Sequence, residues 1–203
     1  EEILLNINNK LNNIDLLKFQ NYLIRRYRKE PIAYILGYKY FWKHKFLINK
    51  SVLIPRPDTE LLIDETLKYL PIDKSKRILD VGTGSGCIVV SLLKERPKCT
   101  ATAIDISKKA INVAKTNAKL HQLENKINFI NIDIDKYKSN NYDLVILSDY
   151  NKGLLVNSLC SKIIEIAKEN SLKVLVDPKG VDFSKYKGAF LITPNLIALN
   201  PDV

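Results

Sequence analysis

The stretch Ile78-Leu79-Asp80-Val81-Gly82-Thr83-Gly84-Ser85-Gly86 decides the fold of this chain. Its first four residues suit a buried strand, and the loop that follows holds three of the chain's seven glycines. The apolar run from Cys87 to Leu93 then predicts a helix. A strand, a glycine-rich turn and a helix form a cup that binds nucleotides, because glycine lets the backbone turn sharply and approach a ligand closely.

An acidic residue stands where such a cup needs one. A second predicted strand, Thr100–Ile104, is followed by Asp105, about 20 positions beyond the last glycine of the loop. A carboxylate at this distance usually holds the two hydroxyls of a ribose. Two other interpretations stay open: the loop is a tight turn or binds a different nucleotide, and Asp105 is the N-cap of the next helix.

The order of predicted elements favours an α/β fold with a doubly wound sheet. From Lys76 onward strands and helices alternate. The predicted strands are 77–81, 100–104, 127–132, 142–147, 172–176 and 189–192, and the predicted helices are 86–95, 107–120 and 153–169. Before them we expect two short helices divided near Asn12-Asn13, a β-hairpin within 31–49, and a helix capped by Asp58 or Thr59.

Composition narrows the class of protein. The chain has 203 residues and a net charge of +10, which indicates either an anionic partner such as RNA or a biased, lysine-rich genome. No stretch approaches the roughly 20 apolar residues that span a bilayer, and the charged start predicts no signal peptide, so we expect a cytoplasmic protein. Three cysteines without a CxxC spacing predict reduced thiols, and two histidines argue against a metal site.

Four segments carry a family resemblance through their order and spacing: Pro31–Gly37, Val52–Glu60, Ile78–Gly86 and Ala103–Ser107. On these segments residues 1–143 resemble the class I S-adenosylmethionine-dependent methyltransferases. More narrowly, they resemble the protein N(5)-glutamine methyltransferases that modify the Gly-Gly-Gln loop of peptide chain release factors. The resemblance implies a Rossmann-like class I methyltransferase sheet, preceded by a short N-terminal helical segment and a β-hairpin.

The resemblance also implies a cofactor, a partner and a set of contacts. S-adenosyl-L-methionine is the expected cofactor and a peptide chain release factor the expected partner, with no direct nucleic-acid binding required, no membrane and no metal. By this resemblance Asp105 binds the ribose, and Asp133 and Ile134 contact the adenine. Pro55, Arg56 and Pro57 line the substrate cleft, although Arg56 and Glu60 also suit a simple role as polar residues at the start of a helix. The methionine end of the cofactor is bound by the loop residues Gly82, Thr83, Gly84, Ser85 and Gly86.

One motif of that family is missing. Its members follow the fourth strand with Asn-Pro-Pro-Tyr, in which the Asn oxygen and a backbone carbonyl accept the two N–H bonds of the substrate amide. Here Ser148 and Asp149 stand at the first two motif positions and are the predicted catalytic residues, since Asp149 could accept an amide N–H. Both an enzyme with reduced or altered activity and a non-catalytic chain stay open.

The last third of the chain resembles another family. The segments Leu147–Gly153, Val174–Gly188 and Leu191–Asn195 are similar to the ribokinase-like D-glycero-β-D-manno-heptose-7-phosphate kinases. The kinase's sugar-binding front and its Gly-Ala-Gly-Asp motif are absent. We therefore interpret the chain as a hybrid: a truncated helical segment and hairpin over 1–50, a cofactor-binding core over 51–142, and a kinase-like αβ segment over 143–203. Hybrid packing predicts marginal stability.

Overall fold

The computed structural model describes residues 12–137, 141–149, 157–178 and 182–193, apart from the side chains of residues 157 and 158. The chain divides after Gly37 into two compact units, so the hairpin belongs to the second unit. Each unit is built from its own contacts and is described separately.

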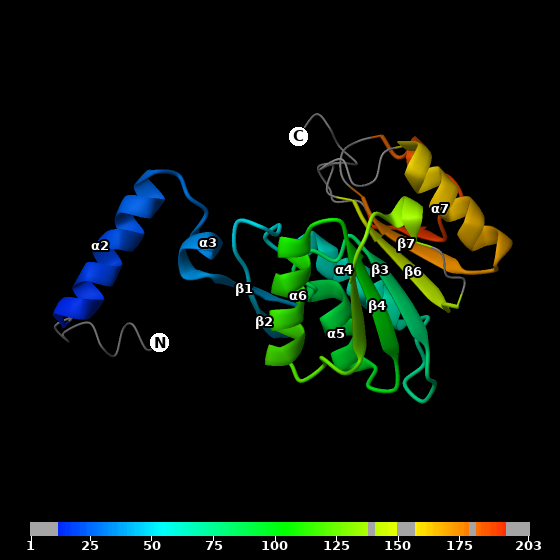
Figure 1. Ribbon diagram of the computed structural model, residues 1–203, viewed down its shortest axis with the longest axis horizontal. Helices are drawn as coiled ribbons and strands as arrows, with labels where there is room; N and C mark the ends of the chain where they lie inside the picture. The colour runs from blue at the N-terminus through cyan, green and yellow to red at the C-terminus, as the bar shows by residue number, and fades with distance from the viewer. Residues whose placement is uncertain (1–11, 138–140, 150–156, 179–181, 194–203) are drawn as a thin grey trace. The chain divides into compact units, whose positions relative to one another are not determined.

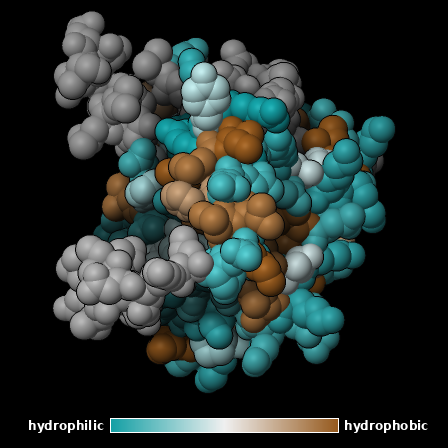
Figure 2. All heavy atoms as spheres, turned by 90° about the vertical axis from the view of Figure 1, so that its left-hand side faces the viewer, coloured by the Kyte–Doolittle hydropathy of each residue, from teal (hydrophilic) through white to brown (hydrophobic). Residues whose placement is uncertain are grey.

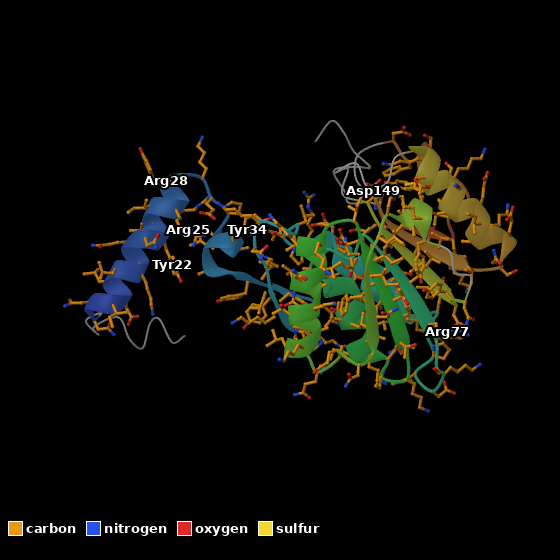
Figure 3. All side chains as sticks on the ribbon, in the orientation of Figure 1. Tyr22, Arg25, Arg28, Tyr34, Arg77 and Asp149 are labelled. Atoms are coloured by element: carbon orange, nitrogen blue, oxygen red, sulfur yellow. The ribbon has the colours of Figure 1, made fainter. Side chains whose placement is uncertain are left out.

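In the described part of the first unit, residues 12–37, an arginine side chain links two helices. Helix α2 (Asn13–Tyr27) begins at Asn12, as the sequence indicated, and α3 (Ile32–Leu36) ends at a left-handed glycine. The guanidinium of Arg25 makes two hydrogen bonds, of 2.9 and 2.8 Å, to the Glu30 carboxylate and also donates to the carbonyl of Tyr34 at 3.0 Å (Figure 3). Bidentate pairing fixes the turn between the helices. The first of the two predicted short helices lies outside the described residues.

Helix α2 buries none of its residues within its unit. Figure 2 shows several hydrophobic residues, coloured brown, among hydrophilic ones on the face that it presents. The exposed apolar side chains of α2 are Ile14, Leu16, Leu17, Phe19, Tyr22, Leu23, Ile24 and Tyr27.

The second unit opens with the predicted hairpin. Strands β1 (Tyr38–Phe41) and β2 (His44–Leu47) pair antiparallel, and a 3₁₀ turn η1 (Pro57–Thr59) leads into α4 (Glu60–Leu67). The carboxylate of Glu60 accepts the Trp42 N–H at 2.8 Å, which ties α4 to the hairpin turn. Thr59 is the N-cap by position, but its side chain makes no capping bond and instead reaches Asp177.

Six parallel strands follow, interleaved with helices as predicted. Their order in the sheet is β5-β4-β3-β6-β7-β8. The strands are β3 (Arg77–Val81), β4 (Thr100–Asp105), β5 (Ile127–Asn131), β6 (Leu144–Ser148), β7 (Lys173–Asp177) and β8 (Leu191–Ile192). The helices between them are α5 (Cys87–Glu95), α6 (Lys108–Leu120) and α7 (Asn157–Glu169), with 3₁₀ turns η2 (Ile134–Lys136) and η3 (Ser184–Tyr186). The bounds of these strands and helices lie within four residues of the predicted ones, and the doubly wound fold class is confirmed. Helix α3 was not predicted, because the sequence indicated a hairpin from residue 31 onward.

The sheet separates two cores, because side chains alternate between its faces. Ile78 of β3 packs with residues of α4, α5 and the hairpin, whereas its neighbours Leu79 and Val81 pack with α7. Helices α5 and α6 accordingly lie on one side of the strands and α7 on the other (Figure 1). The strand order reverses between β3 and β6, and ligands of open α/β sheets bind at the carboxyl ends of the strands at such a point.

The predicted junction of the hybrid falls in the middle of this sheet. Strand β6 pairs residue for residue with β3, from Ile78 opposite Leu144 to Val81 opposite Leu147. Just before β6, the carboxylate of Asp143 accepts the Arg77 N–H at 2.8 Å and the Lys76 ammonium at 2.9 Å. The segment after residue 143 is thus an integral part of the sheet.

Two further properties bear on the compartment and the chemistry. Of the helices in the described ranges, none combines the length and the apolar character that crossing a membrane requires. Cys87, Cys99 and Cys160 are all buried, and none of them forms a disulfide with a described residue.

Candidate functional site

A cavity of about 230 Å³ opens at the carboxyl ends of β3 and β6. Four stretches of the chain line it: the segment 51–55 after the hairpin, the glycine loop, the turn from β4 into α6, and the last residue of β6. Its position is the switch point of the sheet, where the sequence predicted the nucleotide cup. Its lining residues are Ser51, Val52, Leu53, Pro55, Gly82, Thr83, Gly84, Ser85, Cys87, Asp105, Ile106, Ser107, Ala110 and Ser148.

The glycine loop takes a shape that its glycines permit. Gly82, Gly84 and Gly86 all have positive φ angles, of 78°, 56° and 77°. A Cβ on Gly86 would also lie 3.2 Å from the Cβ of Ala114 on α6, so a side chain there is excluded by contact as well as by conformation. The loop is fixed to the sheet because the N–H groups of Gly82 and Thr83 both donate to the carbonyl of Ile104, at 2.9 and 3.0 Å.

Asp105 closes the cavity from the β4 side. It is buried, and its two carboxylate oxygens accept the N–H of Gly84 at 3.0 Å and the N–H of Ser107 at 2.8 Å. The N-cap of α6 is Ser107, whose hydroxyl accepts the Ala110 N–H, so the N-cap interpretation of Asp105 is wrong. Each carboxylate oxygen keeps a second lone pair, and Asp105 can therefore still accept hydrogen bonds from the hydroxyl groups of a ligand in the cavity.

Three polar groups around the cavity are left without partners. No hydrogen bond of ordinary geometry reaches either carboxylate oxygen of Asp80, the Thr83 hydroxyl or the Ser148 hydroxyl from any described residue, although all are buried. Burial raises the pKa of Asp80 to about 7; the nearby Thr83 hydroxyl lowers this pKa in part, and the charge of Asp105 raises it. Buried polar groups are normally satisfied, and a cluster of unsatisfied ones at a cavity indicates a ligand that supplies the missing bonds.

The two predicted catalytic residues have different surroundings. Ser148 is 2% exposed and lines the cavity with its hydroxyl free of any described partner. Asp149 is not among the lining residues, and one of its carboxylate oxygens accepts bonds from Lys185 at 2.5 Å and Tyr186 at 2.6 Å. Tyr150 and Asn151, which stand at the last two positions of the family motif, lie outside the described residues.

The structure brings most of the predicted contacts together. Seven predicted residues line one cavity, namely Pro55, Gly82, Thr83, Gly84, Ser85, Asp105 and Ser148. Gly86 contributes shape as the left-handed N-cap of α5 rather than as lining. Arg56 and Pro57 do not belong to the lining, and neither do Asp133 and Ile134. Asp133 caps η2 by accepting the Asp135 N–H, while Ile134 packs in the core on the α7 side of the sheet.

Two residues of the site were missed in the sequence. Asn117 on α6 is fully buried and donates to the carbonyls of Ser85 at 2.8 Å and Leu47 at 2.9 Å, so it ties the glycine loop to the hairpin. Nothing in an asparagine-rich sequence sets this residue apart. Asp80 did carry a signal, since an acid inside the apolar strand Ile78–Val81 is unusual for a buried position.

The donor and acceptor groups fit the cofactor that the sequence resemblance implied. S-adenosyl-L-methionine carries an ammonium, a sulfonium and ribose hydroxyls, all of which are cationic or hydrogen-bond donors. The cavity region offers acceptors, because the carboxylates of Asp80 and Asp105 and the hydroxyls of Thr83 and Ser148 lie in or next to it. The thiol of Cys87 stays neutral here, since burial raises its pKa to about 12.

Comparisons with known proteins agree with this geometry. Residues 72–185, more than half of the chain, match the family described as "Methyltransferase domain". A "Bifunctional methyltransferase" of Rickettsia typhi is 39% identical over 165 residues, which cover 72% of this chain and 32% of the relative. A "Release factor glutamine methyltransferase" of Coxiella burnetii is 48% identical over 104 residues, covering 51% of this chain and 38% of the relative.

A solved structure aligns over a similar part of the chain. It is a SAM-dependent methyltransferase from Thiobacillus denitrificans in complex with S-adenosyl-L-homocysteine, with a TM-score of 0.48 and 22% identity over 68% of this chain and 61% of that chain. The chain spans about a third of the length of the curated relatives it matches. The family match confirms the Rossmann-like methyltransferase fold and S-adenosyl-L-methionine as the cofactor.

Proposed function

Because the chain belongs to the family of methyltransferase domains, we propose that it transfers the methyl group of S-adenosyl-L-methionine to a glutamine side-chain amide of a peptide chain release factor. The identity to a release factor glutamine methyltransferase supports this substrate, as do the segments Val52–Glu60 and Ile78–Gly86 that the chain shares with that family. The cytoplasm is the compartment in which such a substrate would be met, and this location stays a prediction.

The cofactor, when bound, supplies an electrophilic methyl group on a sulfonium. The glycine loop would hold its methionine end, and Asp105 would accept the ribose hydroxyls with its remaining lone pairs. Asp133 and Ile134 stay predictions for the adenine. The apolar residues Val52, Leu53 and Pro55 would line the place of transfer. As the amide nitrogen gains the methyl group it would lose one proton, which ends in solvent, and S-adenosyl-L-homocysteine would be the leaving group.

The observation that carries the proposal is the Ser148 hydroxyl. It is buried at the end of β6, lines the cofactor cavity and has no described partner. A hydroxyl can accept one N–H of a substrate amide and so orient the nitrogen toward the methyl group. Such positioning lowers the activation barrier for a nucleophile as weak as an amide nitrogen.

A transfer assay tests the proposal. We expect purified chain, S-adenosyl-L-methionine and unmodified release factor to yield a release factor whose Gly-Gly-Gln glutamine has gained one methyl group, read by peptide mass spectrometry. The variant Asp105→Asn should bind cofactor more weakly in calorimetry. Ser148→Ala should bind it within about twofold and transfer more slowly, by about tenfold or more. Cofactor binding without any methylated glutamine would contradict the proposed substrate.

A specific contact favours a second candidate, a cofactor-binding chain without transfer activity. One carboxylate oxygen of Asp149 already accepts bonds from Lys185 and Tyr186, and Asp149 does not line the cavity. Restoring the family motif through Ser148→Asn, Asp149→Pro, Tyr150→Pro and Asn151→Tyr separates the two candidates. Activity that appears only in this quadruple variant favours the non-catalytic chain, and activity in the wild type excludes it. The heptose-kinase resemblance of 143–195 stays a prediction, which ATP titration would test.

A further inference from the structure

Asp149, the residue directly after Ser148 and labelled in Figure 3, is held by two residues from a distant part of the chain. One carboxylate oxygen of Asp149 accepts the ammonium of Lys185 at 2.5 Å and the hydroxyl of Tyr186 at 2.6 Å. All three groups are withdrawn from water: Asp149 is 2% exposed, the Lys185 side chain 9% and Tyr186 0%. A charge-assisted pair with a second donor is among the strongest polar contacts a protein makes.

The main chain at this point is fixed as firmly as the side chain. The N–H of Asp149 donates to the carbonyl of Asp177 at 3.1 Å, continuing the pairing of β6 with β7. The carboxylate of Asp177 in turn accepts the Thr59 hydroxyl at 2.7 Å, from the entry to α4. Because Ser148 precedes Asp149 directly, the same contacts set where the Ser148 hydroxyl stands at the cavity.

The donors are themselves positioned by their own segment. Lys185 and Tyr186 belong to η3, and the turn before η3 is closed by the Asp182 carboxylate, which accepts the Ser184 N–H at 2.9 Å. From α7, the hydroxyl of Ser161 donates to the carbonyl of Lys185 at 3.4 Å. The end of β6 is therefore braced against α7 through η3.

We propose that Lys185 and Tyr186 are positioning residues for methyl transfer, which hold Asp149 and thereby fix the Ser148 hydroxyl at the cofactor cavity. This inference rests on the proposed function, in which Ser148 contacts the substrate amide. It assigns to Asp149 the role of an anchor rather than of an acceptor for the substrate. The contacts predict an effect on turnover that leaves cofactor binding intact, since the glycine loop and Asp105 make none of them.

The test uses variants that keep the buried charge balanced. Removing Lys185 alone would leave the Asp149 carboxylate unpaired, so Asp149→Asn is combined with Lys185→Met, and Tyr186→Phe is made separately. Lys185→Arg keeps the charge and serves as the rescue. Two controls are matched: Lys187→Met removes an exposed charge from the same segment, and Ile164→Val loosens the adjoining α7 core without touching the contacts.

Three quantities are measured for each variant: kcat and KM with release factor, the Kd of S-adenosyl-L-methionine by calorimetry, and the amide hydrogen exchange of the β6 peptide. For the double variant we expect kcat to fall by about tenfold or more, the cofactor Kd to stay within about twofold, and exchange at residues 148–149 to accelerate while β4 is unchanged. Lys185→Arg, Lys187→Met and Ile164→Val should keep kcat within about threefold of the wild type.

Each outcome decides something. Unchanged kcat together with unchanged exchange at residues 148–149 overturns the positioning role. An equal fall of kcat in Ile164→Val also overturns it, because the effect would then be one of stability alone. If the wild type binds cofactor but methylates no release factor, the proposed function fails, and the exchange comparison still decides the brace: acceleration confined to β6 supports it and no acceleration overturns it.

Discussion

The polar groups around the cavity, up to Ser148 at the end of β6, differ from those that follow Ser148. On the glycine-loop side, the Asp80 carboxylate and the Thr83 hydroxyl are buried and have no described hydrogen-bond partner. On the C-terminal side, Asp149 bonds to Lys185 and Tyr186, and Asp177 accepts a bond from Thr59. Burying an unsatisfied polar group costs free energy, so the first set indicates a site for a ligand. The second set has its partners within the protein and stabilises the fold.

The largest effect should come from breaking the paired side. Lys185→Met leaves the Asp149 carboxylate buried without its counter-ion, and we expect the free energy of unfolding to fall by about 3–5 kcal/mol. Denaturant unfolding followed by circular dichroism measures it. The double variant with Asp149→Asn should recover most of the loss, because the remaining amide carries no charge. An equal loss in both variants would show that packing, not charge pairing, holds this segment.

The unpaired side predicts a dependence of stability on pH. The pKa of Asp80 lies near 7 in the folded chain against about 4 in the unfolded chain, so between these values the folded state binds a proton that the unfolded state has lost. Stability from this group is full below about pH 4 and declines by up to about 1.4 kcal/mol per pH unit until about pH 7.

Unfolding of the wild type and of Asp80→Asn, compared from pH 4 to pH 8, isolates this group. The difference in unfolding free energy between the two proteins should grow with pH in that window and level off above it. A difference that stays constant with pH would mean that Asp80 ionises normally and has partners in solution.

Two alanine substitutions in the glycine loop separate conformation from contact. At Gly86, Ala meets both a positive φ and the close approach of Ala114, and we expect a loss of about 2–3 kcal/mol. At Gly84 the added Cβ has only an ordinary contact, 3.8 Å from the Gly82 carbonyl, so the loss should be the conformational cost of about 1–2 kcal/mol. Thermal unfolding gives both values, and equal losses would exclude a role for the contact with α6.

A small effect is also expected from the hydrogen bond between Thr59, at the entry to α4, and Asp177, at the end of β7. Thr59→Val keeps the shape of the side chain but removes the hydrogen bond of 2.7 Å to Asp177, at a cost of about 1–2 kcal/mol. Thr59→Ser keeps the hydroxyl and should lose less. Urea unfolding of the two variants measures the loss in the free energy of unfolding. An equal loss in Thr59→Ser and Thr59→Val would show that the hydrogen bond does not stabilise the fold.

The sequence allowed the fold to be predicted because the pattern of strands and helices is local. Apolar runs such as Ile78–Val81 and Thr100–Ile104 need no knowledge of their neighbours to be identified as buried strands. The loop residues Gly82, Thr83, Gly84 and Ser85 and the strand-end residue Asp105 could be predicted for a related reason, since residues at strand ends and in glycine loops meet at one edge of a parallel sheet. Pro55 and Ser148 were predicted from the family resemblance, and both line the cavity. The adenine contacts Asp133 and Ile134 were placed by resemblance alone, and neither lines the cavity.

What could not be predicted depends on pairs of residues far apart in the chain. Thr59 satisfies the rule for an N-cap, yet its hydroxyl serves Asp177 because the fold brings β7 beside it. Asp149 satisfies the rule for an acceptor next to the cavity, yet Lys185 and Tyr186 occupy it. Propensity and motif rules describe one segment at a time, and they do not say which polar group will be the partner of another.

The sequence by itself determined the sheet and the glycine cup, because strand periodicity and the glycines of a Gly-x-Gly-x-Gly loop are local properties of the chain, whereas the cofactor was predicted from the family resemblance. Only the tertiary structure decided which buried polar groups are available to a ligand and which already have hydrogen-bond partners within the protein. That division follows from desolvation, since a carboxylate or hydroxyl removed from water must find its partner wherever the fold provides one. Ser148 and Asp149 are neighbours in the sequence, and the fold placed them on opposite sides of that division.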